Sequence, residues 1–162
     1  MLDGLPQPEP LRQDSLPVHD LDVYERNGGH TLSKHVDVPP GDELRRIREE
    51  HVAAAGSFRN RATAQRCIYF AIKQREELVR AWLRGRDRHA PLTFVVDMRN
   101  VIGRTLTVDD LRRGSTVPRP ATEVRLVLRR CPELPGGFTV VTAYPTRRLR
   151  HRPRFATRGA AQ

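Results

Sequence analysis

The feature that most constrains the fold of this chain is a change of hydrophobic period near Gly85. Before it, apolar residues recur at spacings of three, four and seven, at positions Ala64, Ile68, Ala71, Leu78 and Trp82. This stripe predicts one amphipathic helix over about residues 62–83, with Gly85 at its C-terminal cap. After it, short runs rich in β-branched residues replace the helical pattern. Helices first and strands later predict an α+β fold, with N-terminal helices packed on a small antiparallel sheet.

Four segments after Gly85 have the composition of strands: residues 92–96, 101–106, 123–130 and 138–144. The last two flank a proline- and glycine-rich loop, which predicts a hairpin. Residues 109–120 lie between strands and are expected to form a polar connection. Earlier in the chain, Asp42 is a candidate N-cap for a short helix over residues 43–54, and Ser57 is a turn residue or a second N-cap.

The two ends of the chain differ in charge from the part between them. Residues 1–24 contain four prolines, five carboxylates and one arginine, a net charge of −4; the whole chain carries +10, so the remainder carries +14. Proline excludes a continuous helix or a central strand, so we expect an acidic leader or linker that lies loosely on the surface or shields the cationic face. Residues 148–162 are expected to form a mobile basic tail. Residues 25–147 remain as a single folded domain.

Several classes of protein are excluded by simple counts. No run of about 18 apolar residues could span a membrane, and the first ten residues lack the basic and apolar regions of a secretory signal peptide. Cys67 and Cys131 are too few for a disulfide framework or an all-cysteine zinc site, so two independent buried thiols are expected, with one bridge between them as the alternative. No HExxH, GxxxxGK[ST] or GxSxG sequence is present, and we expect neither a metal nor a cofactor.

The basic excess is almost entirely arginine, because Lys34 and Lys73 are the only lysines. The guanidinium group binds phosphate through two parallel hydrogen bonds, and strongly cationic domains most often meet nucleic acid or an anionic protein. An arginine-rich genome would produce the same composition without such a partner. Charge therefore does not separate an RNA-cleaving enzyme from an RNA-binding protein.

Five polar side chains are candidates for chemistry. His30 and His35 lie in a segment too polar to be mostly core, and Arg46 follows eleven residues after His35. Thr142 and Tyr144 alternate along the last strand and therefore share one face. A histidine that titrates near neutrality can move protons, arginine can stabilise charge on phosphate oxygens, and hydroxyls can donate hydrogen bonds there. Threonine and tyrosine are also common on solvated strand faces, which is the competing interpretation.

The order and spacing of these residues resemble those of a known family. The resemblance is carried by residues 28–36 (GGHTLSKHV), 44–47 (LRRI), 57–58 (SF), 61–64 (RATA), the helix near Trp82, 102–104 (IGR), 124–128 (VRLVL) and 138–146 (FTVVTAYPT). Over about residues 25–147 the chain is similar to the RNase A-like toxin domain of bacterial contact-dependent growth inhibition and other polymorphic toxin systems. The histidine segment, the His-to-Arg spacing and the terminal Thr-x-Tyr-Pro are specific in combination.

This resemblance implies a pancreatic-ribonuclease-like fold without its disulfides, and a metal-independent endoribonuclease that uses the 2′-hydroxyl of RNA as nucleophile. It also implies a toxin delivered into the cytoplasm of a neighbouring cell, and a cognate immunity protein, expected to be acidic against a cationic cleft; we expect a monomer. The family's active-site His, Arg, Thr and Tyr correspond to His35, Arg46, Thr142 and Tyr144. His30 keeps two interpretations: the complementary acid or base, or an organiser of the turn that precedes it.

Two positions depart from the family pattern or leave it ambiguous. Asp37 and Val38 stand where a glycine and a basic or small residue are expected, and Arg45 beside Arg46 makes the register depend on spacing alone. The rival interpretation is a non-catalytic basic module that binds RNA or DNA, which explains the charge but not four matching positions. A degenerate toxin that binds only its immunity protein is a third, and retention of all four residues argues against it.

Overall fold

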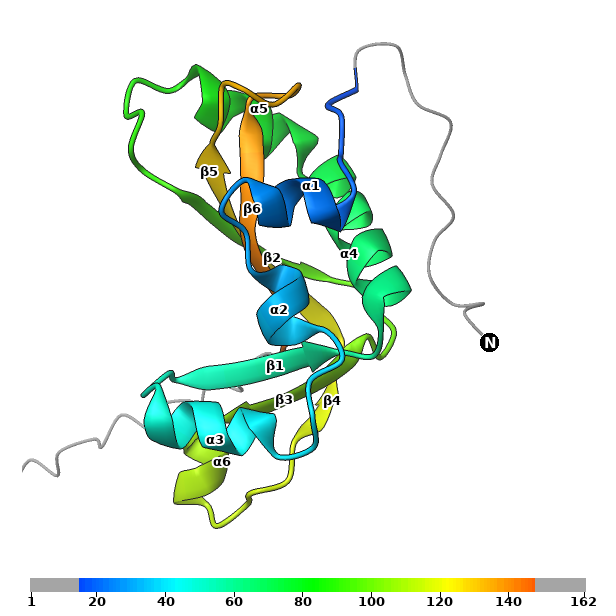
Figure 1. The fold of residues 1–162 in the computed structure, drawn as a ribbon, viewed down its shortest axis with the longest axis vertical. Helices are drawn as coiled ribbons and strands as arrows, with labels where there is room; N and C mark the ends of the chain where they lie inside the picture. The colour runs from blue at the N-terminus through cyan, green and yellow to red at the C-terminus, as the bar shows by residue number, and fades with distance from the viewer. Residues whose placement is uncertain (1–14, 148–162) are drawn as a thin grey trace, which may run out of the picture.

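The computed structural model describes residues 15–147, which contain two three-stranded antiparallel sheets (Figure 1). One sheet has the order β1-β3-β4, formed by β1 (Ala54–Phe58), β3 (Gly103–Thr107) and β4 (Arg119–Ala121). The other has the order β2-β5-β6, formed by β2 (Leu92–Asp97), β5 (Glu123–Arg130) and β6 (Phe138–Thr146). The predicted α+β class with antiparallel pairing is confirmed, although the strands divide between two sheets.

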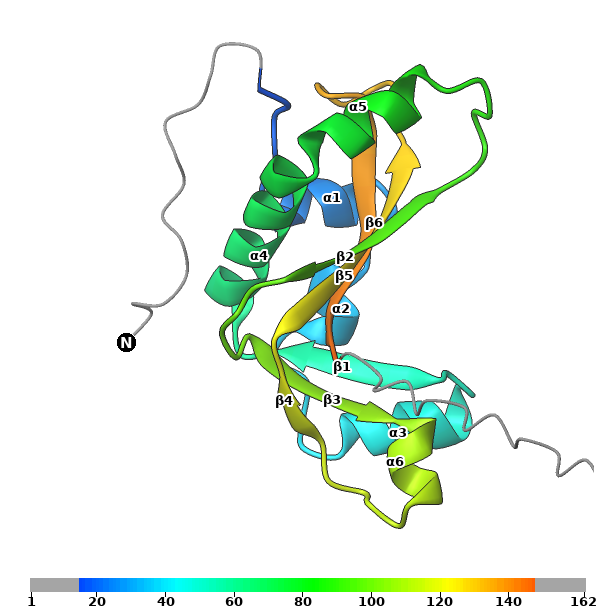
Figure 2. The same cartoon turned by 180° about the vertical axis from the view of Figure 1, so that it is seen from behind.

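Six helices accompany these sheets within residues 15–147: α1 (Leu21–Arg26), α2 (Thr31–His35), α3 (Asp42–Glu49), α4 (Arg61–Gln74), α5 (Glu76–Arg84) and α6 (Val108–Arg112). Helices α1, α4 and α5 lie beside the β2-β5-β6 sheet, whereas α3 and α6 lie beside the β1-β3-β4 sheet (Figures 1 and 2). Helix α2 lies between the two groups, at the level where the sheets meet. Helix α2 contacts both β1 and β6, and β6 also contacts β1 and β3 directly.

Two hydrophobic cores lie within the described residues. The larger core includes Ile68 and Ile72 of α4 with Leu126 and Phe138 of the second sheet, all at most 1% exposed. The smaller core is formed around Ile47, Ala55 and Leu106, between α3 and the first sheet. The larger core also includes Phe58 of β1, so apolar burial, the main favourable term in folding, joins the two sheets.

The helix predicted over residues 62–83 is two helices in the structure. Arg75 leaves the helical conformation, with φ −110° and ψ 23°, so α4 ends before it and α5 begins after it. The break changes the phase of the apolar stripe: the first three predicted positions are buried, but Leu78 is 43% exposed and Val79 is the buried residue. The prediction for Leu78 was wrong because it extended one helical period across the break. Gly85 does cap α5.

The helix predicted over residues 43–54 ends earlier, and a strand follows it. Helix α3 has Gly41 rather than Asp42 at its N-cap, with φ +85°, a conformation that favours glycine. The next segment is β1, which pairs with β3 and includes Ser57, so Ser57 is neither a turn residue nor an N-cap. The sequence Ala-Ala-Gly-Ser of this strand has no alternation of apolar and polar side chains, which is why the strand was missed.

The predicted polar connection over residues 109–120 contains helix α6 and strand β4. Thr107 caps α6 through a reciprocal capping box with Asp110. Pro120 is tolerated in β4 because this strand lies at the edge of its sheet. The predicted hairpin of residues 123–130 and 138–144 is confirmed as β5 and β6, with a register shift at the Val127/Leu128 step.

Part of the predicted acidic leader packs into the domain. Leu16, Leu21 and Tyr24 are at most 8% exposed, and the Leu16 backbone N–H donates to Glu76 Oε1 at 2.9 Å. Residues 15–24 therefore do not lie loosely on the surface. Residues 1–14 and the predicted basic tail over 148–162 lie outside the described residues.

The two cysteines are free and buried, as predicted for independent thiols. Burial raises the pKa of the Cys67 thiol to about 12. Among the described helices, none is both long enough and apolar enough to cross a membrane.

Candidate active site

The site forms where β1 crosses β6, and glycine is what permits this crossing. A Cβ atom at Gly56 would lie 2.1 Å from the backbone oxygen of Pro145 in β6, a separation that backbone atoms cannot relieve. The absence of a side chain therefore lets the two strands approach closely. The same approach brings the Gly56 carbonyl to the end of α2, where His35 lies.

His35 is buried, with 4% of its surface exposed, and its Nδ1 lies 2.7 Å from the carbonyl oxygen of Gly56. A carbonyl oxygen only accepts hydrogen bonds, so Nδ1 carries the proton and Nε2 keeps a lone pair. Burial lowers the pKa of His35 to about 4; the charge of Arg46 acts in the same direction, and the bond to Gly56 acts against it. His35 is therefore neutral near pH 7, the form that a general base requires.

Arg46 lies beside His35, and Arg45 does not. Arg46 is 8% exposed, and its Nη1 is 3.4 Å from His35 Nδ1 and 3.4 Å from the Lys34 carbonyl oxygen. Because Nη1 and Nδ1 both carry hydrogen, their contact is an approach of a cation to a ring and not a hydrogen bond. Arg45 points outward and pairs with Asp42 at 2.7 Å. The structure thus places the arginine selected by spacing next to the histidine.

Tyr144 and Thr142 extend from β6 into the same region. The Tyr144 ring is 5.2 Å from the His35 ring, centroid to centroid, and inclined by 30°. Regular pairing of Thr142 with Val127 and of Tyr144 with Arg125 keeps the two hydroxyl residues on one face, as predicted. The Thr142 Oγ1 is buried and has no hydrogen-bond partner among the described residues. Buried hydroxyls are nearly always paired, so this one is suited to a bound ligand.

The His30 ring also lies near His35, with 6.3 Å between the ring centroids. Its backbone N–H donates to the Val141 carbonyl at 2.9 Å, which fixes the turn after Gly28-Gly29. Burial lowers its pKa, and the positive charges of Lys34 and Arg46 add to this effect against that of Glu25. Both predicted interpretations of His30 are consistent with this position, because the backbone holds the turn while the ring lies beside His35.

Three supporting residues were missed by the sequence analysis. The Gly56 carbonyl orients His35, and the Thr31 hydroxyl accepts from the Ala143 backbone N–H at 2.9 Å, which fixes α2 on β6. Glu43 is 1% exposed and accepts from Ser57 Oγ and from Arg104 Nε, both at 2.6 Å, which fixes α3 on the first sheet. The glycine inside Ala-Ala-Gly-Ser-Phe could have indicated a close backbone approach. Nothing in the sequence distinguishes Glu43 from the exposed acids of the same helix.

The geometry defines a class of site: a neutral imidazole with an available lone pair, a cation beside it, and hydroxyl groups on the neighbouring strand. Such a set can remove a proton and stabilise an anion. Within residues 15–147, no three His, Cys, Asp or Glu side chains gather in a way that could hold a metal ion.

The chain belongs to the family described as the bacterial CdiA-CT RNase A domain, whose model matches residues 29–145. This confirms the family resemblance and the RNase A-like fold without disulfides. The chain is also similar to a chain of the CdiA-CT/CdiI complex from Y. kristensenii 33638, with a TM-score of 0.64 and 29% sequence identity. That match covers 73% of this chain and 99% of the solved one. No curated protein matches the chain.

Proposed function

We propose that this protein is a metal-independent endoribonuclease toxin that cleaves RNA by attack of the substrate's own 2′-hydroxyl. The observation that carries the proposal is the state of His35: its Nδ1 lies 2.7 Å from the Gly56 carbonyl oxygen and keeps its proton there, so the unprotonated Nε2 is left to act as base. Membership of the CdiA-CT RNase A domain family supports the same chemistry. The charge of +10 over the whole chain also favours a polyanionic substrate.

In the proposed reaction, His35 Nε2 takes the proton of the 2′-hydroxyl. The 2′-oxygen then forms a bond to phosphorus while the bond from phosphorus to the 5′-oxygen breaks. The products are a 2′,3′-cyclic phosphate and a chain that begins with a 5′-hydroxyl, once the leaving oxygen has received a proton. Because the base is supplied by a side chain and the nucleophile by the substrate, no step requires a metal.

Arg46 is the group proposed to stabilise the charge that builds up on the non-bridging phosphate oxygens. Its contacts in the free protein are long, 3.3 Å to Glu50 and 3.4 Å to the Lys34 carbonyl, so they offer little resistance to a stronger bidentate bond with phosphate. The Thr142 hydroxyl, which has no partner among the described residues, is proposed to donate to the same oxygens.

Two residues are candidates for the acid that protonates the leaving 5′-oxygen: His30 and Tyr144, whose rings are 6.3 Å and 5.2 Å from the His35 ring. An aryl oxide leaves without such a proton. A substrate with an aryl leaving group therefore shows which of the two residues supplies the proton. We expect the variant that lacks the acid, His30→Ala or Tyr144→Phe, to cleave RNA poorly and the aryl ester normally. Equal losses on both substrates would assign that residue another role.

The proposal is tested by incubating the purified protein and its His35→Ala variant with total RNA. We expect the substitution to abolish cleavage, by a factor of at least about 10²–10⁴ for loss of a general base, while circular dichroism shows an intact fold. His89→Ala, at an exposed histidine, is the matched control and should be fully active. A folded His35→Ala protein with wild-type activity would overturn the assignment. Binding of RNA without cleavage by the wild type would instead favour the non-catalytic module.

We also propose that the protein acts after delivery into a neighbouring cell, as a monomer, and is neutralised by its own immunity protein. Support comes from the similar solved chain, which is part of a CdiA-CT/CdiI complex. The partner is expected to be acidic because the chain is strongly cationic. Equimolar immunity protein should block RNA cleavage. If charge drives formation of the complex, 0.5 M salt should weaken it, because at this ionic strength the Debye length is on the order of 4 Å and charges farther apart are screened.

A further inference from the structure

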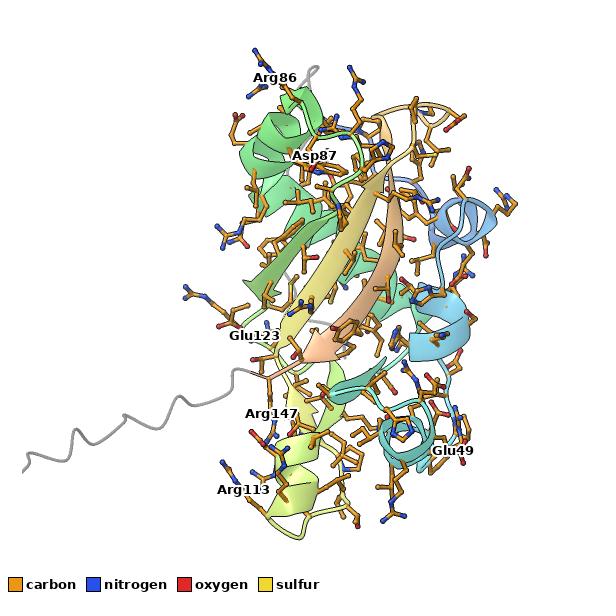
Figure 3. The ribbon with its side chains drawn as sticks, turned by 90° about the vertical axis from the view of Figure 1, so that its left-hand side faces the viewer. Glu49, Arg86, Asp87, Arg113, Glu123 and Arg147 are labelled. Atoms are coloured by element: carbon orange, nitrogen blue, oxygen red, sulfur yellow. The ribbon has the colours of Figure 1, made fainter. Side chains whose placement is uncertain are left out.

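Helix α1 belongs to the folded domain although it precedes the residues that the family model matches. That model begins at residue 29, whereas α1 spans Leu21–Arg26. Leu21 and Tyr24 are at most 1% exposed and form part of the larger core. Helix α1 contacts α2 and lies directly beside it in two views of the molecule (Figures 1 and 3). The helix that carries His35 therefore has a neighbour to which the proposed reaction assigns no role.

Glu25 connects the two helices. Its Oε1 accepts hydrogen bonds from the backbone N–H groups of Leu32 and Ser33, the latter at 3.2 Å. These are the second and third residues of α2, whose N–H groups have no partner inside a helix and are usually bound by the side chain at the N-cap. The N-cap residue of α2 is His30, whose ring makes no capping bond among the described residues. Glu25 therefore supplies from another helix the cap that α2 lacks locally, and its charge strengthens both bonds.

The cap lies less than one helical turn from His35. Helix α2 has five residues, and at a rise of about 1.5 Å per residue the bonds of Glu25 are separated from His35 by roughly 3–5 Å along the axis. A helix this short is not stable by itself, so its orientation depends on its contacts with other elements. Thr31 fixes one side of it to Ala143 of β6, and His35 reaches the Gly56 carbonyl of β1. Without the bonds of Glu25, the first turn would be free to tilt about these contacts and to carry the His35 ring away from Gly56.

Glu25 also adds a negative charge to the groups around His30. Lys34 of α2 and Arg46 of α3 act on His30 with positive charges, and Arg129 of β5 bonds the backbone of the turn before it. The proposed base is neutral near pH 7. Burial lowers the pKa of His30, Lys34 and Arg46 lower it further, and Glu25 opposes them. The protonation of His30 therefore reports on the presence of the Glu25 charge.

We propose that Glu25 is a positioning residue of the active site, which caps α2 from outside and thereby holds the His35 ring against the Gly56 carbonyl. Glu25 acts through α2 and does not take part in the reaction itself. The inference rests on the proposed ribonuclease function insofar as His35 is the base, but the geometry that Glu25 holds exists without substrate. Its effect is therefore measurable both in the reaction and in the free protein.

Three substitutions separate the hydrogen bonds of Glu25 from its charge. Glu25→Gln keeps an oxygen that accepts from both N–H groups and removes the charge, whereas Glu25→Met has a similar length and removes both. We expect Glu25→Met to lower kcat for RNA cleavage by about tenfold to a hundredfold, as for a small misplacement of a catalytic group, with little change in KM. Glu25→Gln should keep most of the wild-type kcat at its own pH optimum. Glu25→Asp, shortened by one methylene, should lose kcat to a smaller extent, and it replaces Glu25→Met if that variant does not fold.

The free protein gives a second measurement, by NMR titration of the histidine rings. The pKa of His35 should rise from about 4 toward 6.5 in Glu25→Met, because the ring leaves its buried position, and should stay near 4 in Glu25→Gln. In Glu25→Gln the pKa of His30 should instead fall, because the charge that opposed its lowering is gone. A cap with a purely structural role would lower stability in urea without moving either pKa or the kcat of the folded protein, and that result would overturn the proposal.

Glu77→Met is the matched control. Glu77 is an exposed glutamate in the first turn of α5, and it makes no hydrogen bond or ion pair within the part of the chain that the structure describes. This variant should leave kcat and both histidine pKa values unchanged. Glu25→Gln as impaired in kcat as Glu25→Met would contradict the proposal, since the charge and not the cap would then matter. A wild type that does not cleave RNA contradicts the proposed function instead, and the pKa of His35 in Glu25→Met then decides the role of Glu25.

Discussion

Lowering the pH should destabilise this protein through His35 before its carboxylates are protonated. Burial holds the pKa of this histidine at about 4, against an ordinary value of 6.5. The unfolded chain therefore binds a proton on His35 as the pH falls through 6.5, while the folded protein does not until about 4. The stabilisation from neutral His35 is complete above pH 6.5 and is lost progressively between 6.5 and 4.

The size of the effect follows from the same two values. Each tenfold difference in proton affinity is worth about 1.4 kcal/mol. His35 alone should therefore lower the free energy of unfolding by about 2 kcal/mol between pH 7 and pH 5, and by about 3 kcal/mol at pH 4. Asp110 contributes at lower pH, because its bonds to Arg147 and Thr107 outweigh burial and hold its pKa below 3.8.

Urea unfolding, followed by circular dichroism at several pH values, measures this dependence. His35→Asn is the informative variant, since its side-chain amide can donate to the Gly56 carbonyl in place of Nδ1–H and does not titrate. We expect this variant to lose most of the pH slope between 6.5 and 4; a remainder is expected from His30, whose pKa is also lowered. His89→Asn, at an exposed position, should keep the wild-type slope. Identical slopes for wild type and His35→Asn would refute the argument that burial keeps His35 neutral.

Three further predictions concern catalysis and the close approach of the strands. Arg46→Lys should lose about 2–4 kcal/mol of transition-state stabilisation, mainly in kcat, because lysine lacks the planar fork of arginine. Arg45→Lys changes an outward-facing residue and should have almost no effect on kcat. Equal small effects of the two substitutions would remove Arg46 from the site. Cleavage of RNA should persist in excess EDTA, and a fully 2′-deoxy substrate should not be cut. Activity that EDTA abolishes and Mg²⁺ or Zn²⁺ restores, or cleavage of DNA at a comparable rate, would point to another class of nuclease. Gly56→Ala should destabilise the fold by about 1–3 kcal/mol, as overpacking does, and should also reduce kcat, because the new Cβ displaces the carbonyl that orients His35. Gly41→Ala, where a Cβ meets no atom within 4 Å, should cost only the strain of its positive φ and leave kcat unchanged.

The sequence by itself determined the elements that have a strong period or a fixed spacing. The β5–β6 hairpin was predictable because apolar residues recur along both strands and a Pro-Gly loop separates them. Strand alternation placed Thr142 and Tyr144 on one face, and helical geometry separates Arg45 from Arg46 by about 100° around α3, so that only one of them can face His35. Local geometry of this kind is contained in the order of residues along the chain.

Only the tertiary structure decided the remainder, because it depends on contacts between segments far apart in the sequence. The break at Arg75, the strand β1 and the burial of residues 15–24 arise from packing against partners that a local pattern does not contain. The protonation state of His35 has the same origin. A histidine on a short helix is held neutral because β1 and β6 cross at Gly56, where the ring is buried and a carbonyl oxygen faces Nδ1. The sequence identified His35 as a candidate, and the crossing of two strands distant in the sequence lowers its pKa.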